Sequence, residues 1–297
     1  MMVGLTHAAV SVARTATFLV PRWLRRLLSD VGPPTTLDGV NDWDRTPRPD
    51  LVPVILLHGT ETGPHRWQGL VDRLRADDRP VFALTYGRET SSLRGRATGF
   101  GTGHLAASAG ELALFVERVR ECTGAARVDI VGHSQGGLLG HLYVKWLGGE
   151  RAVRHLVTLG APVHGASPLG RFDAITQAPL VGTGLDALLG PSAREQLRTS
   201  PVIRELSSTP DVVPGVRYTA IVTRYDDTVL PVDAQLLRPA EQDVINRYVQ
   251  DEYPQNRVGH SELPLDPEVI AMIVDALGRP HADGADSTGT TGTPSTS

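Results

Sequence analysis

Short, continuous runs of apolar residues recur along the middle of the chain and alternate with segments of helical periodicity. The runs are rich in Val, Ile, Leu and Thr and are bounded by Gly, Pro or charge, which is typical of strands buried on both faces. They occupy residues 51–57, 81–86, 127–131, 154–159, 217–223 and 244–249. Strands that alternate with helices predict an α/β fold, with a mostly parallel sheet and helices on both of its faces.

The clearest helical pattern covers residues 104–124. Leu105, Leu112 and Val116 fall on one face of this segment, and Gly124 supplies a stop at its end. A second helix is expected after the run at 127–131, and a third at the carboxyl end of the chain's apolar part.

The two ends of the chain differ in composition from the middle. Residues 1–38 form an extension with a cluster of arginines, for which we favour a short amphipathic helix packed on the domain surface over weak membrane-surface contact. Residues 280–297 are mostly Gly, Ser, Thr, Pro and Asp, which predicts a disordered tail. Residues 39–279 are expected to form one domain. Within it, residues 164–215 lack a strand-like run and predict an inserted cap or lid.

Charge and cysteine content exclude some classes of protein. The formal net charge of −4 provides no basic field, so nucleic acid is not an expected partner. Cys122 is the single cysteine, so no internal disulfide can form. The arginines near the start follow an apolar stretch, whereas in a secretory signal the charge comes first. We therefore expect a cytoplasmic location.

The candidate chemistry begins at residues 132–136, which read Gly-His-Ser-Gln-Gly and match the pattern G-x-S-x-G. In this pattern a sharp turn from strand to helix holds a serine hydroxyl in an exposed position, and the glycines let the turn close. The segment lies between an apolar run and a helical segment, as the motif requires. Ser134 is therefore the candidate nucleophile, and a glycine-rich turn without chemistry is the alternative.

A serine nucleophile needs a histidine to take its proton and a carboxylate to orient that histidine. Asp226 and Asp227 follow the run at 217–223, and Asp226 is the preferred acid. His260 follows the run at 244–249 and is the best-placed base. No HExxH motif or cysteine-pair spacing is present, so neither a metal nor another cofactor is predicted.

The developing negative charge on a reacting carbonyl oxygen requires preset N–H donors. One should be the backbone N–H of Gln135, which follows the candidate nucleophile. The other should come from the loop after the run at 51–57, where Gly59 allows close approach of the backbone. The N–H of Thr60 is the candidate there, and a simple turn is the alternative.

These segments together resemble the α/β-hydrolase superfamily, and more narrowly the bacterial triacylglycerol lipases and esterases of lipase class 2. The resemblance is carried, in the family's order, by residues 39–45 (GVNDWDR), 54–60 (VILLHGT), 81–87 (VFALTYG), 110–137, 213–231 and 259–278. It implies the α/β-hydrolase fold for the domain and the roles given above for Ser134, Asp226, His260, Thr60 and Gln135. It also supports residues 164–215 as a segment that covers the substrate.

Members of that family are typically exported and carry cysteine pairs, which this sequence lacks. The difference favours an enzyme that acts inside the cell, although the resemblance itself is to exported proteins.

The sequence thus predicts a carboxylic ester hydrolase, a triacylglycerol lipase or carboxylesterase, that acts on lipid or small-molecule esters, with acylglycerols favoured. Its Ser-Asp-His triad would work through an acyl-enzyme. Two alternatives stay open: an acyltransferase on the same fold, and a binding protein that retains the fold without catalysis.

Overall fold

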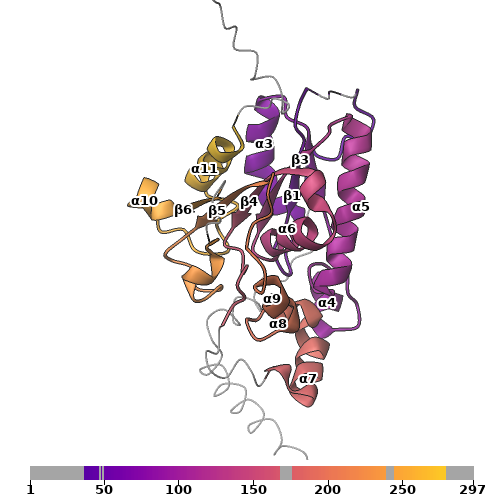
Figure 1. Cartoon of the computed structure of the whole chain (residues 1–297), viewed down its shortest axis with the longest axis vertical. Helices are drawn as coiled ribbons and strands as arrows, with labels where there is room; N and C mark the ends of the chain where they lie inside the picture. Colours follow the sequence, from indigo (N-terminus) through magenta and orange to yellow (C-terminus); the bar gives the residue numbers. More distant parts are fainter. Residues whose placement is uncertain (1–36, 47, 49, 168–175, 239–243, 279–297) are drawn as a thin grey trace, which may run out of the picture. The chain divides into compact units, whose positions relative to one another are not determined.

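The computed structural model describes residues 37–46, 48, 50–167, 176–238 and 244–278 (Figure 1). Of the expected N-terminal extension only residues 37 and 38 are among them. The expected tail at 280–297 and part of the expected cap, residues 168–175, lie outside the described residues.

One parallel sheet forms the centre of the described fold. Its strands lie in the order β2-β1-β3-β4-β5-β6, and each neighbouring pair is parallel. The strands are β1 (Val54–Leu57), β2 (Val81–Leu84), β3 (Val128–His133), β4 (Val153–Leu159), β5 (Arg217–Val222) and β6 (Val244–Tyr248). Because all six point the same way, their carboxyl ends meet at one edge of the sheet.

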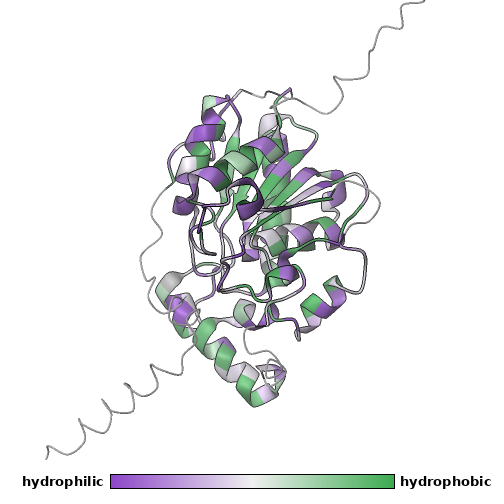
Figure 2. Ribbon diagram, turned by 90° about the vertical axis from the view of Figure 1, so that its left-hand side faces the viewer, coloured by the Kyte–Doolittle hydropathy of each residue, from purple (hydrophilic) through white to green (hydrophobic). Residues whose placement is uncertain are grey.

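The inner strands are buried on both faces, as their continuous apolar runs predict. Ile55 and Leu57 of β1 belong to one core cluster, and Val54 and Leu56 belong to a second on the opposite face. Alternate residues of a strand point to opposite faces, so a strand that feeds two cores must be apolar throughout. Figure 2 shows hydrophobic residues concentrated in these central strands.

β6 departs from the predicted burial. It lies at the edge of the sheet, and Ile245 is exposed there. An apolar run indicates a strand, but whether a neighbour covers it depends on strand order, which the run itself does not contain.

Helices cover both faces of the sheet (Figure 1). α5 and α6 contribute to the first core cluster, whereas α3 and α11 contribute to the second. The longer helices are α3 (Gln68–Ala76), α5 (Leu105–Thr123), α6 (Gln135–Trp146), α7 (Pro179–Leu189) and α11 (Pro267–Leu277). The shorter ones are η1 (Pro64–Trp67), α4 (Leu93–Thr98), η2 (Gly149–Arg151), α8 (Pro191–Glu195), α9 (Pro201–Leu206), η4 (Val232–Gln235) and α10 (Val249–Glu252).

α5 shows how the sequence pattern becomes structure. Its buried side chains include Leu105, Leu112 and Val116, which the pattern placed on one face. The helix ends where Gly124 adopts a left-handed conformation with φ of 71°, and its N–H bonds the carbonyl of Arg120. Cys122 is only partly buried near this end, packed against the first core cluster.

The described part of residues 164–215 contains α7, α8 and α9, and no strand of the sheet. This segment connects β4 to β5 and is tied back to the rest of the fold. The Ser192 hydroxyl at the start of α8 donates to the carbonyl of Gly101, and the Ser192 N–H bonds the carbonyl of Thr102.

Candidate active site

Ser134 occupies a strained turn between β3 and α6. Its φ of 52° and ψ of −120° lie in a region that residues with side chains rarely adopt. The neighbouring glycines explain how the turn closes. A Cβ atom at Gly132 would lie 2.5 Å from the carbonyl oxygen of Gly136, and a Cβ at Gly136 would meet the carbonyl oxygen of Leu57. The G-x-S-x-G spacing is therefore required by packing at this turn.

Asp226 and His260 form a buried pair beyond the carboxyl end of β5. Nδ1 of His260 lies 2.6 Å from Oδ2 of Asp226, to which it donates. The backbone N–H groups of Thr228 and Val229 donate to Oδ1, and Nε2 of Gln235 donates to Oδ2 at 3.0 Å. Burial raises the pKa of Asp226, but the imidazole and these hydrogen bonds outweigh burial, so the pKa lies below its ordinary value. The carboxylate is thus held in its charged form.

The structure separates the two candidate aspartates. Asp226 is buried against His260, whereas Asp227 is partly exposed and accepts a hydrogen bond from the hydroxyl of Thr228. Of the two, Asp226 is therefore the residue with the geometry that orients an imidazole.

The end of β4 brings the serine and the histidine to the same edge of the sheet. The N–H of Ser134 bonds the carbonyl of Leu159, and the next residue, Gly160, lies against the imidazole of His260. A Cβ at Gly160 would stand 3.0 Å from Nδ1 of His260. The side chain of Ser134 is buried, with 7% of the residue exposed, and its hydroxyl forms no hydrogen bond with another described residue. Catalytic hydrogen bonds are often long in structures without substrate.

The loop that carries His260 is anchored to the end of β5. The hydroxyl of Thr223 donates to the carbonyl of Val258 at 2.8 Å, and Nε2 of Gln250 donates to the same hydroxyl. These bonds connect the loop to the strand that precedes Asp226, so the acid and the base share one support.

His133 makes a contact that the sequence did not indicate. Its Nε2 donates to the carbonyl of His260 at 3.0 Å, and the two rings lie 4.9 Å apart. Burial and the neighbouring His260 lower the pKa of His133 well below its ordinary value, so its ring is neutral. The residue next to the candidate nucleophile therefore supports the backbone of the candidate base.

The loop after β1 packs directly on the strained turn. A Cβ at Gly59 would lie 3.0 Å from Nδ1 of His133 and 3.3 Å from the Cβ of Ser134, so the loop approaches the turn closely here. The N–H groups of Thr60 and Gln135 form no hydrogen bond with any other described residue. Gln135 begins α6, so its N–H has no acceptor within the helix. Both predicted donors thus lie beside Ser134 with their N–H groups unpaired within the described chain.

Tyr86 and His58 hold the start of this loop. The phenol of Tyr86 donates to the carbonyl of His58 at 2.6 Å, and the two rings stack with centroids 4.3 Å apart. Burial lowers the pKa of His58 to about 4, so its ring is neutral near pH 7.

Two further contacts hold the other end of the loop, and the sequence indicated neither. Glu61 has a positive φ of 57° and pairs with Arg94 of α4, both side chains being buried. Nε2 of Gln196, which follows α8, donates to the hydroxyl of Thr60 at 3.0 Å. Residues 164–215 therefore contact the predicted oxyanion loop directly.

The described residues offer neither a metal site nor a membrane-spanning helix. They contain no group of three or more His, Cys, Asp or Glu side chains arranged to hold a metal ion. Among the described helices, none combines the length and the apolar character needed to cross a bilayer.

A parallel sheet with helices on both faces and a strained serine at the end of its third strand defines an α/β-hydrolase. Residues 51–230 match the family Lipase (class 2), a match that covers more than half of the chain. The protein therefore belongs to the class 2 lipases, a family of carboxylic ester hydrolases.

Solved structures show the same fold at low sequence identity. Lipase B of Aspergillus fumigatus is 20% identical with a TM-score of 0.60, over 78% of this chain and 53% of that chain. The lin2722 gene product of Listeria innocua is 17% identical with a TM-score of 0.52, over 79% of this chain and 96% of that chain. A structure reported for the metagenome-derived lipolytic enzymes LipS and LipT is 14% identical with a TM-score of 0.53, over 82% of this chain and 98% of that chain. The chain spans about half the length of the Aspergillus lipase.

Proposed function

We propose that the protein is a serine hydrolase that cleaves carboxylic esters through an acyl-enzyme on Ser134. The observation that carries this proposal is the buried pair of Asp226 and His260, with 2.6 Å between the carboxylate and Nδ1, beside a serine in a strained turn. Because Nδ1 carries the proton that bonds Asp226, Nε2 of His260 is left as the basic nitrogen.

The reaction would proceed in two halves. The hydroxyl of Ser134 attacks the ester carbonyl while Nε2 of His260 takes its proton, and the imidazolium then protonates the departing alcohol. A water molecule deprotonated by the same nitrogen attacks the acyl-enzyme and releases the acid. Asp226 stays ionised throughout and stabilises the imidazolium, in agreement with the lowered pKa of its carboxyl.

The negative oxygen of each tetrahedral intermediate would accept hydrogen bonds from the N–H groups of Thr60 and Gln135. These donors gain most when they are held in place before the reaction. The ion pair of Glu61 with Arg94 and the hydrogen bond from Gln196 to Thr60 supply that support.

Lipid esters of the acylglycerol type are the proposed substrates, and residues 164–215 are proposed to cover them as a cap. Support comes from the family and from α7, an apolar helix on which Leu180 is 91% exposed and Leu188 is also exposed. An apolar surface of this kind fits contact with acyl chains. We also propose a cytoplasmic location, because Cys122 has no partner for a disulfide in this sequence.

Covalent labelling and activity measurements test the proposal. A fluorophosphonate probe should label the protein at Ser134, and absence of labelling would favour a binding protein without catalysis. p-Nitrophenyl esters of increasing chain length should be hydrolysed, and an emulsified triacylglycerol should be cleaved. Loss of activity beyond short acyl chains would restrict the substrates to those of an esterase. Acyl transfer to added glycerol in preference to water would identify an acyltransferase instead.

A further inference from the structure

A cavity of about 790 Å³ opens between α9, η4 and β6, apart from the candidate catalytic residues. The described residues that line it do not include Ser134, Asp226 or His260. Its volume falls within the range of sites for small molecules and cofactors. A role for this cavity is not accounted for by ester hydrolysis at Ser134.

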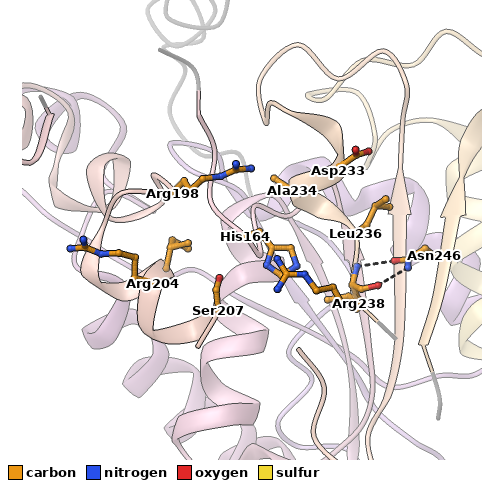
Figure 3. Close-up of a pocket in the computed structure, with 11 residues that line it drawn as sticks. His164, Arg198, Arg204, Ser207, Asp233, Ala234, Leu236, Arg238 and Asn246 are labelled. Carbon is orange, nitrogen blue, oxygen red and sulfur yellow. Dashed lines mark hydrogen bonds between the residues drawn. The ribbon is translucent and has the colours of Figure 1, made fainter. Parts of the chain in front are cut away.

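Two arginines from distant parts of the chain project into the cavity. In Figure 3, Arg198 extends toward the η4 side, Arg238 extends toward His164, and Arg204 points away from both. Neither Arg198 nor Arg238 forms a side-chain ion pair or hydrogen bond with another described residue. Each of these guanidinium groups offers N–H donors to an anionic group in the cavity.

The backbones that carry these arginines are fixed. The N–H of Arg198 bonds the carbonyl of Ala166 at 2.9 Å. The N–H of Arg238 bonds Oδ2 of Asp211 at 2.7 Å, and the preceding Leu237 exchanges two hydrogen bonds with the side chain of Asn246 (Figure 3). With the backbone already fixed, ligand binding has to order only the two side chains.

The charge around the cavity favours an anion, although the chain as a whole carries −4. Three arginines line it against one aspartate, Asp233. Asp211 is not among the lining residues. Its Oδ2 accepts a hydrogen bond from the backbone N–H of Arg238 and lies 3.1 Å from Nε2 of His164. Burial raises the pKa of Asp211, but the nearby imidazole of His164 and the N–H of Arg238 outweigh it and lower the pKa, so this carboxylate stays charged.

The rest of the wall combines the polar residues His164, Ser207 and Asn246 with an apolar part. Ile203, Ala234 and Leu237 are buried and line the cavity together with Leu236. A free phosphate or acetate ion would fill a small part of this volume and leave the apolar wall uncovered. The lining therefore matches a molecule with an anionic end and an apolar body.

The cavity and the candidate catalytic acid share one structural element. Asp233, Ala234 and Leu236, in and next to η4, line the cavity, while Gln235 in the same turn donates to Oδ2 of Asp226. A ligand in the cavity would thus lie against the turn that supports the acid.

We infer that this cavity is a second ligand site, which binds an anionic amphiphile. Arg198 and Arg238 hold a carboxylate or phosphate head group, and the apolar part of the lining, of which Leu236 is partly exposed, receives its apolar chain. The inference does not rest on ester hydrolysis, because the ligand contains no bond that the proposed reaction would break.

Isothermal titration calorimetry with laurate and dodecyl phosphate, below their micellar concentrations, tests the site. At least one should bind the unmodified protein, and the tighter of the two identifies the head group. The double variant Arg198→Gln/Arg238→Gln should bind it at least about tenfold more weakly, because two charged hydrogen bonds are lost. Arg151→Gln, a change at an arginine whose side chain is 81% exposed outside the cavity, should leave binding unchanged.

Dodecanol and inorganic phosphate test the two halves of the ligand. Dodecanol should bind the double variant and the unmodified protein alike, and inorganic phosphate should bind at least tenfold more weakly than dodecyl phosphate. Two results with the amphiphiles would contradict the proposed site: neither of them binds, or the double variant binds them with full affinity. Two results with the controls would also contradict it: the double variant loses as much affinity for dodecanol as for laurate, or inorganic phosphate binds the unmodified protein as tightly as dodecyl phosphate does. Both arginines are exposed, so the double variant should keep the melting temperature of the unmodified protein. If the double variant does not fold, the single variants Arg198→Gln and Arg238→Gln replace it in the titrations.

Discussion

The carboxylate of Asp226 and Nδ1 of His260 lie 2.6 Å apart, although 34 positions and the whole of β6 separate them in the chain. The parallel order of β5 and β6 brings both to the carboxyl edge of the sheet. Thr223 and Gln250 then hold the loop of His260 against the end of β5. The pairing is thus a property of the sheet and its edge, and it distinguishes Asp226 from its neighbour Asp227.

Replacement of each aspartate by asparagine should give very different results. Asp226→Asn removes the charge that fixes the tautomer of His260, so kcat for a p-nitrophenyl ester should fall by about 10⁴-fold. Asp227→Asn, the matched control, should change kcat by less than about threefold, because its partly exposed side chain accepts from Thr228 and not from His260. A larger loss in Asp227→Asn than in Asp226→Asn would reverse the assignment of the acid.

Gln235 should act as a positioning residue for Asp226. Its Nε2 donates to Oδ2 of Asp226 and to the carbonyl of Val229. Gln235→Leu should lower kcat about tenfold with little change in KM, because the carboxylate loses one of its fixed donors. Equal kcat values for Gln235→Leu and the unmodified enzyme would show that this hydrogen bond is dispensable.

Removal of Arg94 should leave a buried carboxylate without its cation. Burial raises the pKa of Glu61, and the attraction of Arg94 offsets part of that effect. Arg94→Met should lower the free energy of unfolding by about 3–5 kcal/mol, as is typical for a broken buried pair. The loss should shrink as pH falls, because a carboxyl with a raised pKa in the folded state takes up its proton more readily there than in the unfolded chain.

Chemical denaturation at several pH values measures this effect. The double variant Glu61→Gln/Arg94→Met, which buries no charge at the site, should recover most of the lost stability. If the double variant is as unstable as Arg94→Met at neutral pH, packing and not the unpaired charge causes the loss.

Buried histidines should make the protein less stable in acid. Burial lowers the pKa of His141 and of His155 from 6.5 to about 3. Between pH 6.5 and 3 the unfolded chain binds protons at these residues and the folded protein does not, so the free energy of unfolding falls as pH falls. His141→Phe keeps the stacked contact with Tyr218 and should reduce that slope by up to about 1.4 kcal/mol per pH unit. An unchanged slope in urea titrations between pH 6 and 4 would show that His141 is protonated in the folded state.

The apolar runs predicted the strands well because strands buried on two faces leave little choice of residue. The same runs could not give strand order, so the exposure of Ile245 in β6 was missed. Ser134 could be predicted from its motif because the turn itself demands Gly132 and Gly136. Asp226 and His260 could be predicted from their places after strands, which meet at one edge in a parallel sheet.

The supporting contacts could not be predicted in the same way. His133 and Gln196 form hydrogen bonds with residues more than 100 positions away, and Gln235 bonds a residue nine positions away across an irregular loop. No local spacing marks such partners. The buried pair of Glu61 and Arg94 reads in the sequence as two ordinary charged residues in separate segments. Contacts of this kind depend on how loops pack, and they appear only when the fold is known.

The most direct test of the proposed function is the turnover of p-nitrophenyl butyrate by Ser134→Ala. The kcat/KM of this variant should fall at least about 10³-fold, because the nucleophile is gone. The melting temperature should stay nearly unchanged, since the Ser134 hydroxyl bonds no other described residue. Ser208→Ala, at an exposed serine after α9, should retain full activity. Turnover by folded Ser134→Ala at the rate of the unmodified enzyme would contradict the account.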